Sequence, residues 1–212
     1  MLFATAGGCG SQSPPAAIDG AGNATPSSVV VPEPPAPPKP TSDSQHPVVL
    51  IETSLGNVTV QLDREKALLT VDNFLRYVGA SFYDQTVIHQ VYKGQGILGG
   101  GYGTNMVAKP ARTPIYNEAD NGLKNSRGTI AMVRLPDAIH SATSQFFINV
   151  ADNPSLDYRD RTPEGYGYCV FGKVTDGMDV VDKINGVSLR DMPEFERTPM
   201  EPVIVKSIRR IR

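Results

Sequence analysis

The sequence of 212 residues has no tryptophan, two cysteines, three histidines and no apolar run of 18 residues. The missing run excludes a transmembrane helix, which needs about 20 consecutive and mostly apolar residues. Cys9 and Cys169 are distant, and His46, His89 and His140 are scattered, so no metal-ligand spacing is present. We therefore expect no metal and no cofactor, and we interpret Cys169, in an apolar strand-like run, as a buried reduced thiol.

Net charge is also nearly absent, with a formal value of -2. A protein that binds nucleic acid through its phosphates needs a basic face, so we expect no nucleic-acid partner. The basic residues near the C-terminus are too few for such a face and are interpreted as the solvated end of a strand: Lys206, Arg209, Arg210 and Arg212.

Two common enzyme signatures are missing or incomplete. No G-x-S-x-G nucleophile elbow occurs, so a hydrolase is poorly supported. Residues 94–99 satisfy G-x-G-x-x-G, but a dinucleotide site needs a helix to begin at the last glycine. Gly100, Gly101 and Gly103 follow instead, and each glycine costs about 1 kcal/mol in a helix relative to alanine. We exclude a nucleotide site on this ground.

Proline is abundant, and ten of the 18 prolines lie in residues 1–47. Residues 31–40 favour polyproline II and would reach about 31 Å when extended. Because this part of the chain has few large apolar side chains, it cannot offset its ordering entropy. We therefore expect residues 10–47 to be a disordered tether, ahead of a folded domain at 48–212.

Residues 1–9 place small residues ahead of Cys9 and resemble the end of a bacterial lipoprotein signal. The resemblance implies an exported, periplasmic protein with a membrane tether through Cys9, and two acyl chains would make such an anchor stable. The alternative is a flexible start with an incidental cysteine.

The region 48–212 shows many short strand patterns and two helix patterns. A first helix has Thr70 as its N-cap and Gly79 as its stop, and a second fits 177–185. Strands are expected at 48–53, 57–62, 87–92, 97–99, 128–133, 145–150, 168–174 and 202–209. This pattern predicts a mainly antiparallel β domain, but it does not distinguish a sandwich from a barrel.

Four blocks of this region resemble bacterial, often periplasmic, cyclophilins, a family of peptidyl-prolyl cis-trans isomerases: 117–123, 127–132, 141–149 and 168–174. The resemblance covers 48–212. It implies a closed eight-stranded antiparallel β-barrel capped by two α-helices. It also implies a monomer whose partners are proline-containing peptides and unfolded protein clients.

Isomerisation of an Xaa-Pro bond needs no nucleophile, metal or cofactor. The barrier of about 18–20 kcal/mol comes from amide resonance. An enzyme must hold the proline ring and favour the twisted amide, in which the prolyl nitrogen regains a lone pair. A donor aimed at that nitrogen bonds only in the transition state and therefore raises the rate.

At eight positions the resemblance assigns a role to the residue that is present. It places Phe147, Leu156 and Met132 in the proline pocket, Gln145 in a polar wall, and His89 near that wall. It assigns the peptide-binding strand edge to Val133 and Arg134, and Tyr168 stands where many members have histidine. Gln145 and His89 are the kept members of the predicted catalytic set. His89 also has a structural interpretation, because the reaction moves no proton. Arg134 and His140 are alternatively solvated loop residues.

Five neighbouring positions depart from the family: Gln90 replaces the catalytic arginine, Gln95 a pocket phenylalanine, Gly96 a methionine, Leu98 the glutamine that orients the arginine, and Ser155 an aromatic residue at the rim. A hydrogen bond from a charged donor contributes about 1.5–3 kcal/mol and one from a neutral donor about 0.5–1.5. A loss of about 1.4–3 kcal/mol slows a reaction by roughly 10- to 100-fold. We therefore expect a slow isomerase with Gln90 as its donor and Gln95 and Ser155 at its pocket. The alternative is a non-catalytic module or chaperone that binds proline segments.

Overall fold

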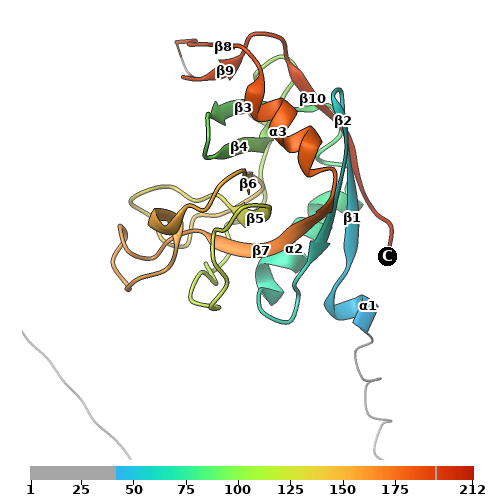
Figure 1. Ribbon diagram of the computed structural model, residues 1–212. Helices are drawn as coiled ribbons and strands as arrows, with labels where there is room; N and C mark the ends of the chain where they lie inside the picture. Colours follow the sequence, from blue (N-terminus) through green and yellow to red (C-terminus); the bar gives the residue numbers. More distant parts are fainter. Residues whose placement is uncertain (1–41, 194) are drawn as a thin grey trace, which may run out of the picture. The chain divides into compact units, whose positions relative to one another are not determined.

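The computed structural model of the protein describes residues 42–193 and 195–212 (Figure 1). The predicted signal remnant with Cys9 and most of the predicted tether lie outside these residues. The end of the tether, however, is ordered: α1 (Ser42–Gln45) is a short helix. The carbonyl of Gln45 accepts from the backbone N–H of Arg64 and that of Pro47 from Leu62, both at 2.8 Å. The folded part therefore begins before residue 48.

Eight strands close into one antiparallel barrel, as predicted, so the sandwich alternative is wrong. Around the barrel their order is β1-β10-β3-β4-β6-β5-β7-β2. The strands are β1 (Val48–Thr53), β2 (Gly56–Leu62), β3 (Thr86–Tyr92), β4 (Gly96–Gly103), β5 (Thr129–Met132), β6 (Phe146–Asn149), β7 (Cys169–Asp176) and β10 (Val203–Arg210). Since the glycine-rich stretch that follows residue 95 forms β4, no helix begins there.

Alternation along the strands fills the interior of the barrel. In β2, Val58, Val60 and Leu62 are buried, whereas the residues between them are partly exposed. Successive side chains of a strand point to opposite faces, so one set lines the core and the other faces outward. The same period of two determines which residues of β3 to β6 point to the outer surface of the barrel, where the candidate site lies.

Two helices pack against the barrel, as predicted: α2 (Leu68–Gly79) and α3 (Met178–Gly186). From α2, the Phe74 ring packs against Tyr83 and Phe171 with ring centroids 5.1 and 5.2 Å apart. From α3, Val181 and Ile184 are fully buried. In the described part of the chain, neither helix is long and apolar enough to cross a membrane.

The start of α2 differs from the prediction that made Thr70 its N-cap. The helix begins at Leu68, and Thr70 is buried inside it. The carboxylate of Glu118 accepts from the N–H groups of Leu69 and Thr70 at 3.1 and 2.8 Å and from the Thr70 hydroxyl at 2.8 Å. A carboxylate is favourable at a helix N-terminus, and this one comes from a distant loop that local sequence patterns do not reveal. Cys169, beside Thr70, is buried and free as expected, and burial raises the pKa of its thiol to about 12.

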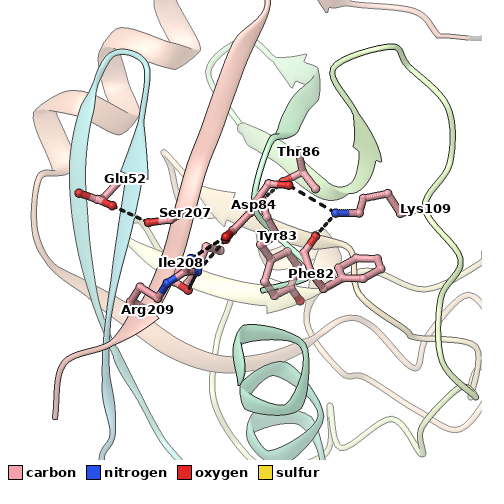
Figure 2. Close-up of polar contacts among 9 residues, drawn as sticks. All are labelled: Glu52, Phe82, Tyr83, Asp84, Thr86, Lys109, Ser207, Ile208 and Arg209. Carbon is pink, nitrogen blue, oxygen red and sulfur yellow. Dashed lines mark hydrogen bonds and ion pairs between the residues drawn. The ribbon is translucent and has the colours of Figure 1, made fainter. Parts of the chain in front are cut away.

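The turn that leads into β3 is fixed to β10, as Figure 2 shows. Arg209 donates two hydrogen bonds to the carboxylate of Asp84, at 2.7 and 2.5 Å, and these hold the pKa of Asp84 below its usual range. Lys109 donates to the backbone carbonyls of Phe82 and Asp84. The Thr86 hydroxyl donates to the carbonyl of Tyr83 at 2.7 Å. Arg209 is thus paired rather than only solvated, and β3 starts from a fixed point.

A further segment, residues 187–200 between α3 and β10, contains a small hairpin that the sequence did not predict. Its strands are β8 (Leu189–Arg190) and β9 (Thr198–Pro199), which pair with each other. Figure 1 shows the hairpin beside β3. The backbone N–H of Val91 donates to the carbonyl of Arg197 at 3.0 Å, so this segment is bonded to the end of β3 that β10 does not reach.

Candidate active site

One row of side chains crosses the outer face of four strands. Gln90 of β3 pairs with Leu98 of β4, which pairs with Phe147 of β6. Phe147 in turn pairs with Ala131 of β5. Directly paired residues of antiparallel strands have their side chains on the same face, so these four lie side by side outside the core.

The next row faces the barrel interior and contains Met132. Met132 pairs with Phe146, and both side chains belong to the buried core. Met132 is therefore not a pocket residue, which corrects its assignment to the proline pocket. Its neighbour Ala131 lines the pocket instead, because a shift of one residue along a strand reverses the face.

An apolar cavity of about 190 Å³ opens over the outer row. It is lined by Tyr92, Gln95, Leu98, Ala131, Val133, Phe147, Leu156 and Tyr168. Five of these were predicted as substrate-binding residues: Gln95, Val133, Phe147, Leu156 and Tyr168. The cavity is suited to a single small apolar ring, with polar groups only at its edge.

The floor of the cavity depends on the glycine at position 96. A Cβ atom at Gly96 would lie 2.3 Å from Cζ of Phe147, so the Phe147 ring occupies that space. The ring of Tyr92 meets Phe147 edge-on, with centroids 6.1 Å apart. Tyr92 was not predicted, although the period of two along β3 places it on the same face as Gln90.

A β-bulge in β3 sets the direction of His89. The pairing register shifts between Ile88 and Gln90, which re-aims the side chain between them. His89 is 2% exposed and packs against the rings of Tyr102 and Phe195, with centroids 4.6 and 5.6 Å away. Burial lowers its pKa to about 4, so the imidazole is neutral at neutral pH. It does not line the cavity, and its Nδ1 has no hydrogen-bond partner among the described residues.

The other two predicted catalytic residues flank the cavity without lining it. Nε2 of Gln90 donates to the carbonyl of Glu196 at 3.3 Å. The side chain of Gln145 lies over Gly101, where an added Cβ would be 2.7 Å from its Cγ. The backbone carbonyl of Gln145 accepts from the N–H of Val133 at 2.9 Å, which continues the pairing of β6 and β5. The two amides are thus held on the same outer face.

Arg134 is not a solvated loop residue: it is 7% exposed. Its guanidinium donates to four backbone carbonyls, those of Gly167, Leu135, Pro136 and Pro163. It also lies over the ring of Tyr168, 5.3 Å from the centroid, so it fixes one side of the cavity. His140 is likewise engaged, stacked on Tyr116 with centroids 4.1 Å apart. The solvated interpretation of Arg134 is therefore wrong, whereas His140 is exposed in its loop, as that interpretation has it.

The last predicted residue, Ser155, is exposed in the short 3-10 helix Pro154–Leu156 and does not line the cavity. Its neighbour Leu156 does, and the Leu156 carbonyl accepts from the N–H of Tyr168 at 2.9 Å. Position 155 itself carries a serine and so adds no aromatic side chain to the rim.

Arg197 is a site residue that no sequence motif indicated. Its guanidinium lies over the ring of Tyr92, 5.0 Å from the centroid. Arg197 lies near the cavity because residues 187–200 pack against β3, a strand that is far from them in the sequence.

No metal site was found within residues 42–193 and 195–212, where no three His, Cys, Asp or Glu side chains gather around a common point. A second cavity, of about 350 Å³, lies at β2 and β7 and includes His46 and Lys124. None of the predicted site residues lines this second cavity, so we take the cavity at Phe147 as the candidate substrate site.

Comparisons with known proteins agree with this geometry. Residues 48–210 match the family "Cyclophilin type peptidyl-prolyl cis-trans isomerase/CLD". The chain is 47% identical over 161 residues to peptidyl-prolyl cis-trans isomerase B of Escherichia coli (strain K12), covering 76% of this chain and 98% of that protein. It is 46% identical over 164 residues to peptidyl-prolyl cis-trans isomerase A of Dickeya dadantii (strain 3937), covering 77% and 84%.

The fold matches solved structures as well. A crystal structure of a cyclophilin type peptidyl-prolyl cis-trans isomerase from Cryptosporidium parvum superimposes with a TM-score of 0.62, at 24% identity, covering 79% of this chain and 98% of that one. The sequence match over the whole barrel, together with this fold and the apolar cavity, shows that the chain belongs to the cyclophilin-type peptidyl-prolyl cis-trans isomerases.

Proposed function

We propose that this protein isomerises Xaa-Pro bonds in peptides and unfolded protein clients, at a lower rate than relatives with arginine at position 90. One observation supports this most strongly: the apolar cavity at Phe147 is formed, while the residue beside it on β3 is Gln90. The protein thus has a place for the proline ring and an uncharged donor at its edge.

The proline ring enters the cavity between Phe147, Val133 and Leu156, which lose water-accessible apolar area to it. The twisting amide then lies toward β3. The amide nitrogen of Gln90 carries two N–H groups. It can keep its bond to Glu196 and offer the second N–H to the prolyl nitrogen.

Replacing a charged donor with a neutral one lowers the stabilisation of the twisted amide by about 1.5 kcal/mol. The expected reduction in kcat is therefore roughly 10-fold or more. Affinity for the peptide depends mainly on the apolar cavity and should change less.

Two-dimensional exchange NMR on a peptide with a single Xaa-Pro bond tests this proposal. We expect faster cis-trans exchange with the protein than without it, at a lower rate per molecule than with the E. coli relative. A rate equal to that of the relative contradicts the reduced activity. Binding without any faster exchange shows instead a non-catalytic module that holds proline segments.

We also propose that the protein is exported to the periplasm and anchored to a membrane through Cys9. Support comes only from the small residues ahead of Cys9 and from the proline-rich segment that follows. Mass spectrometry of the protein purified from membranes tests it. A diacyl modification at Cys9, lost together with membrane association in Cys9→Ser, is expected, and an unmodified Cys9 contradicts the anchor.

A further inference from the structure

Residues 195–197 form an additional layer on the altered edge of the site. The carbonyl of Arg197 accepts from Val91, and that of Glu196 accepts from the Gln90 side chain at 3.3 Å. The ring of Phe195 packs on Tyr102, with centroids 4.7 Å apart. These contacts hold the segment against the strand whose family arginine is missing.

The side chain of Arg197 is a cation at the edge of the cavity. It is exposed, and among residues 42–193 and 195–212 no carboxylate pairs with its guanidinium. Asp191 accepts only from the backbone N–H of Arg197, at 2.9 Å. The guanidinium instead lies on Tyr92, whose ring lines the cavity and contacts Phe147. Stacking on an aromatic face orients a guanidinium and leaves its N–H groups at the edge to donate.

The backbone at this position gives a second, independent indication. Arg197 has φ 57°, in the left-handed region that glycine and asparagine adopt more easily than other residues. Such conformations persist where surrounding contacts enforce them, and they are frequent at functional sites. Here the bonds to Asp191 and Val91 enforce the turn through the backbone. The turn therefore does not require an arginine side chain, although it carries one.

We propose that Arg197 is a second catalytic donor, cationic where Gln90 is neutral, that makes up for part of the stabilisation lost with the arginine at position 90. When a proline ring occupies the cavity, the guanidinium moves from the Tyr92 ring and donates to the Xaa-Pro amide as it twists. Gln90 keeps its bond to Glu196, which holds the segment in place, and offers its second N–H to the same amide. This role of Arg197 rests on the proposed isomerase function.

The test compares Arg197→Gln with wild type by exchange NMR on a single-proline peptide, using the full chain. The bond to the twisted amide forms only in the transition state, so kcat should fall roughly 10-fold or more while KM changes little. Arg197→Lys should retain part of the activity, since it keeps the charge. Arg190→Gln in β8 is the matched control: it removes the same charge from the same segment, away from the cavity, and should leave both constants unchanged.

A variant compatible with the backbone of this turn separates an effect on catalysis from an effect on folding. Arg197→Asn tolerates the left-handed backbone, so its unfolding temperature should equal or exceed that of wild type, while its kcat falls as in Arg197→Gln. A wild-type kcat in both variants overturns the role of Arg197 and leaves the isomerase function intact. An equal loss of kcat in Arg190→Gln also overturns it, because the loss would then come from the charge of the segment and not from the position of Arg197. No faster exchange with wild type overturns both proposals.

Discussion

The two walls of the cavity at Phe147 differ in how far they match the residues expected from the cyclophilin resemblance, and we call them the kept wall and the altered wall. The wall from β5, β6 and the loop before β7 keeps its apolar residues, among them Val133, Phe147 and Leu156. The wall from β3 and β4 carries Gln90 paired with Leu98. The resemblance to cyclophilins leads us to expect an arginine and the glutamine that orients it at these two positions. From this difference we infer that opposite sides of one cavity perform separate tasks: one holds the proline ring, and the other stabilises the twisted amide.

Side-chain hydrogen bonds hold the backbone of both walls; on the altered wall, Asn185 donates to the carbonyls of Tyr92 and Gly96 at 2.9 and 3.1 Å. Arg134 ties the loops of the kept wall through four backbone carbonyls, and the Asn125 side chain donates to the carbonyl of Leu156 at 2.9 Å. On the altered wall, Gln90 makes a single long side-chain bond to Glu196. The weakly held part of the site is therefore the Gln90 side chain itself, and not the backbone of its wall.

The largest effect is expected from Arg134→Met, which breaks the kept wall. Four backbone carbonyls, that of Gly167 being buried, lose a charged donor. Each such bond contributes about 1.5–3 kcal/mol when buried, so we expect a loss in stability of about 3 kcal/mol. Urea unfolding measures it. Arg161→Met, at an exposed residue, is the control and should be neutral. A loss below about 1 kcal/mol would mean that Arg134 does not hold this wall.

A pH effect of similar size should come from His89, behind the altered wall. Its folded pKa of about 4 lies below the usual value of 6.5, so neutral His89 favours the fold above pH 6.5. This contribution is lost as the pH falls toward 4, by up to about 3 kcal/mol. Urea unfolding across this pH range should show a smaller decrease in the free energy of unfolding for His89→Phe than for wild type. Parallel profiles for the two proteins would contradict the buried neutral state.

Gly96→Ala should disturb the floor that the two walls share. The new Cβ would overlap the Phe147 ring and the carbonyl of Ile148, and overpacking of this kind costs about 1–3 kcal/mol. Peptide affinity should fall because Phe147 must move, as a titration followed by NMR would show. Gly186→Ala, whose Cβ would contact nothing within 4 Å, is the control. Unchanged affinity in Gly96→Ala would show that Phe147 is not the floor.

The smallest effect is expected from Gln90→Arg alone, less than about 3-fold in kcat. Leu98 is directly paired with position 90 and offers no polar group to orient the new arginine. Adding Leu98→Gln should raise the rate further. A large gain from the single change would show that orientation by position 98 is unnecessary.

The sequence predicted the barrel and most of the kept wall, because alternation and family motifs are local. Met132 was misplaced by one residue, since a strand boundary from sequence does not fix which face a residue takes. Glu118 at the start of α2 and Arg197 beside Tyr92 could not be predicted, because each acts on a segment distant in the chain. The altered wall is therefore understood only when tertiary packing is known.

The most direct measurement is an NMR titration that gives Kd and the catalysed exchange rate separately, for this protein and for the E. coli relative, on one single-proline peptide. The account predicts similar Kd values, because the kept wall binds the ring, and an exchange rate lower by roughly 10-fold. Equal exchange rates would contradict the division of tasks between the two walls. So would a peptide affinity of this protein that is weaker than that of the relative by enough to explain the whole difference in activity.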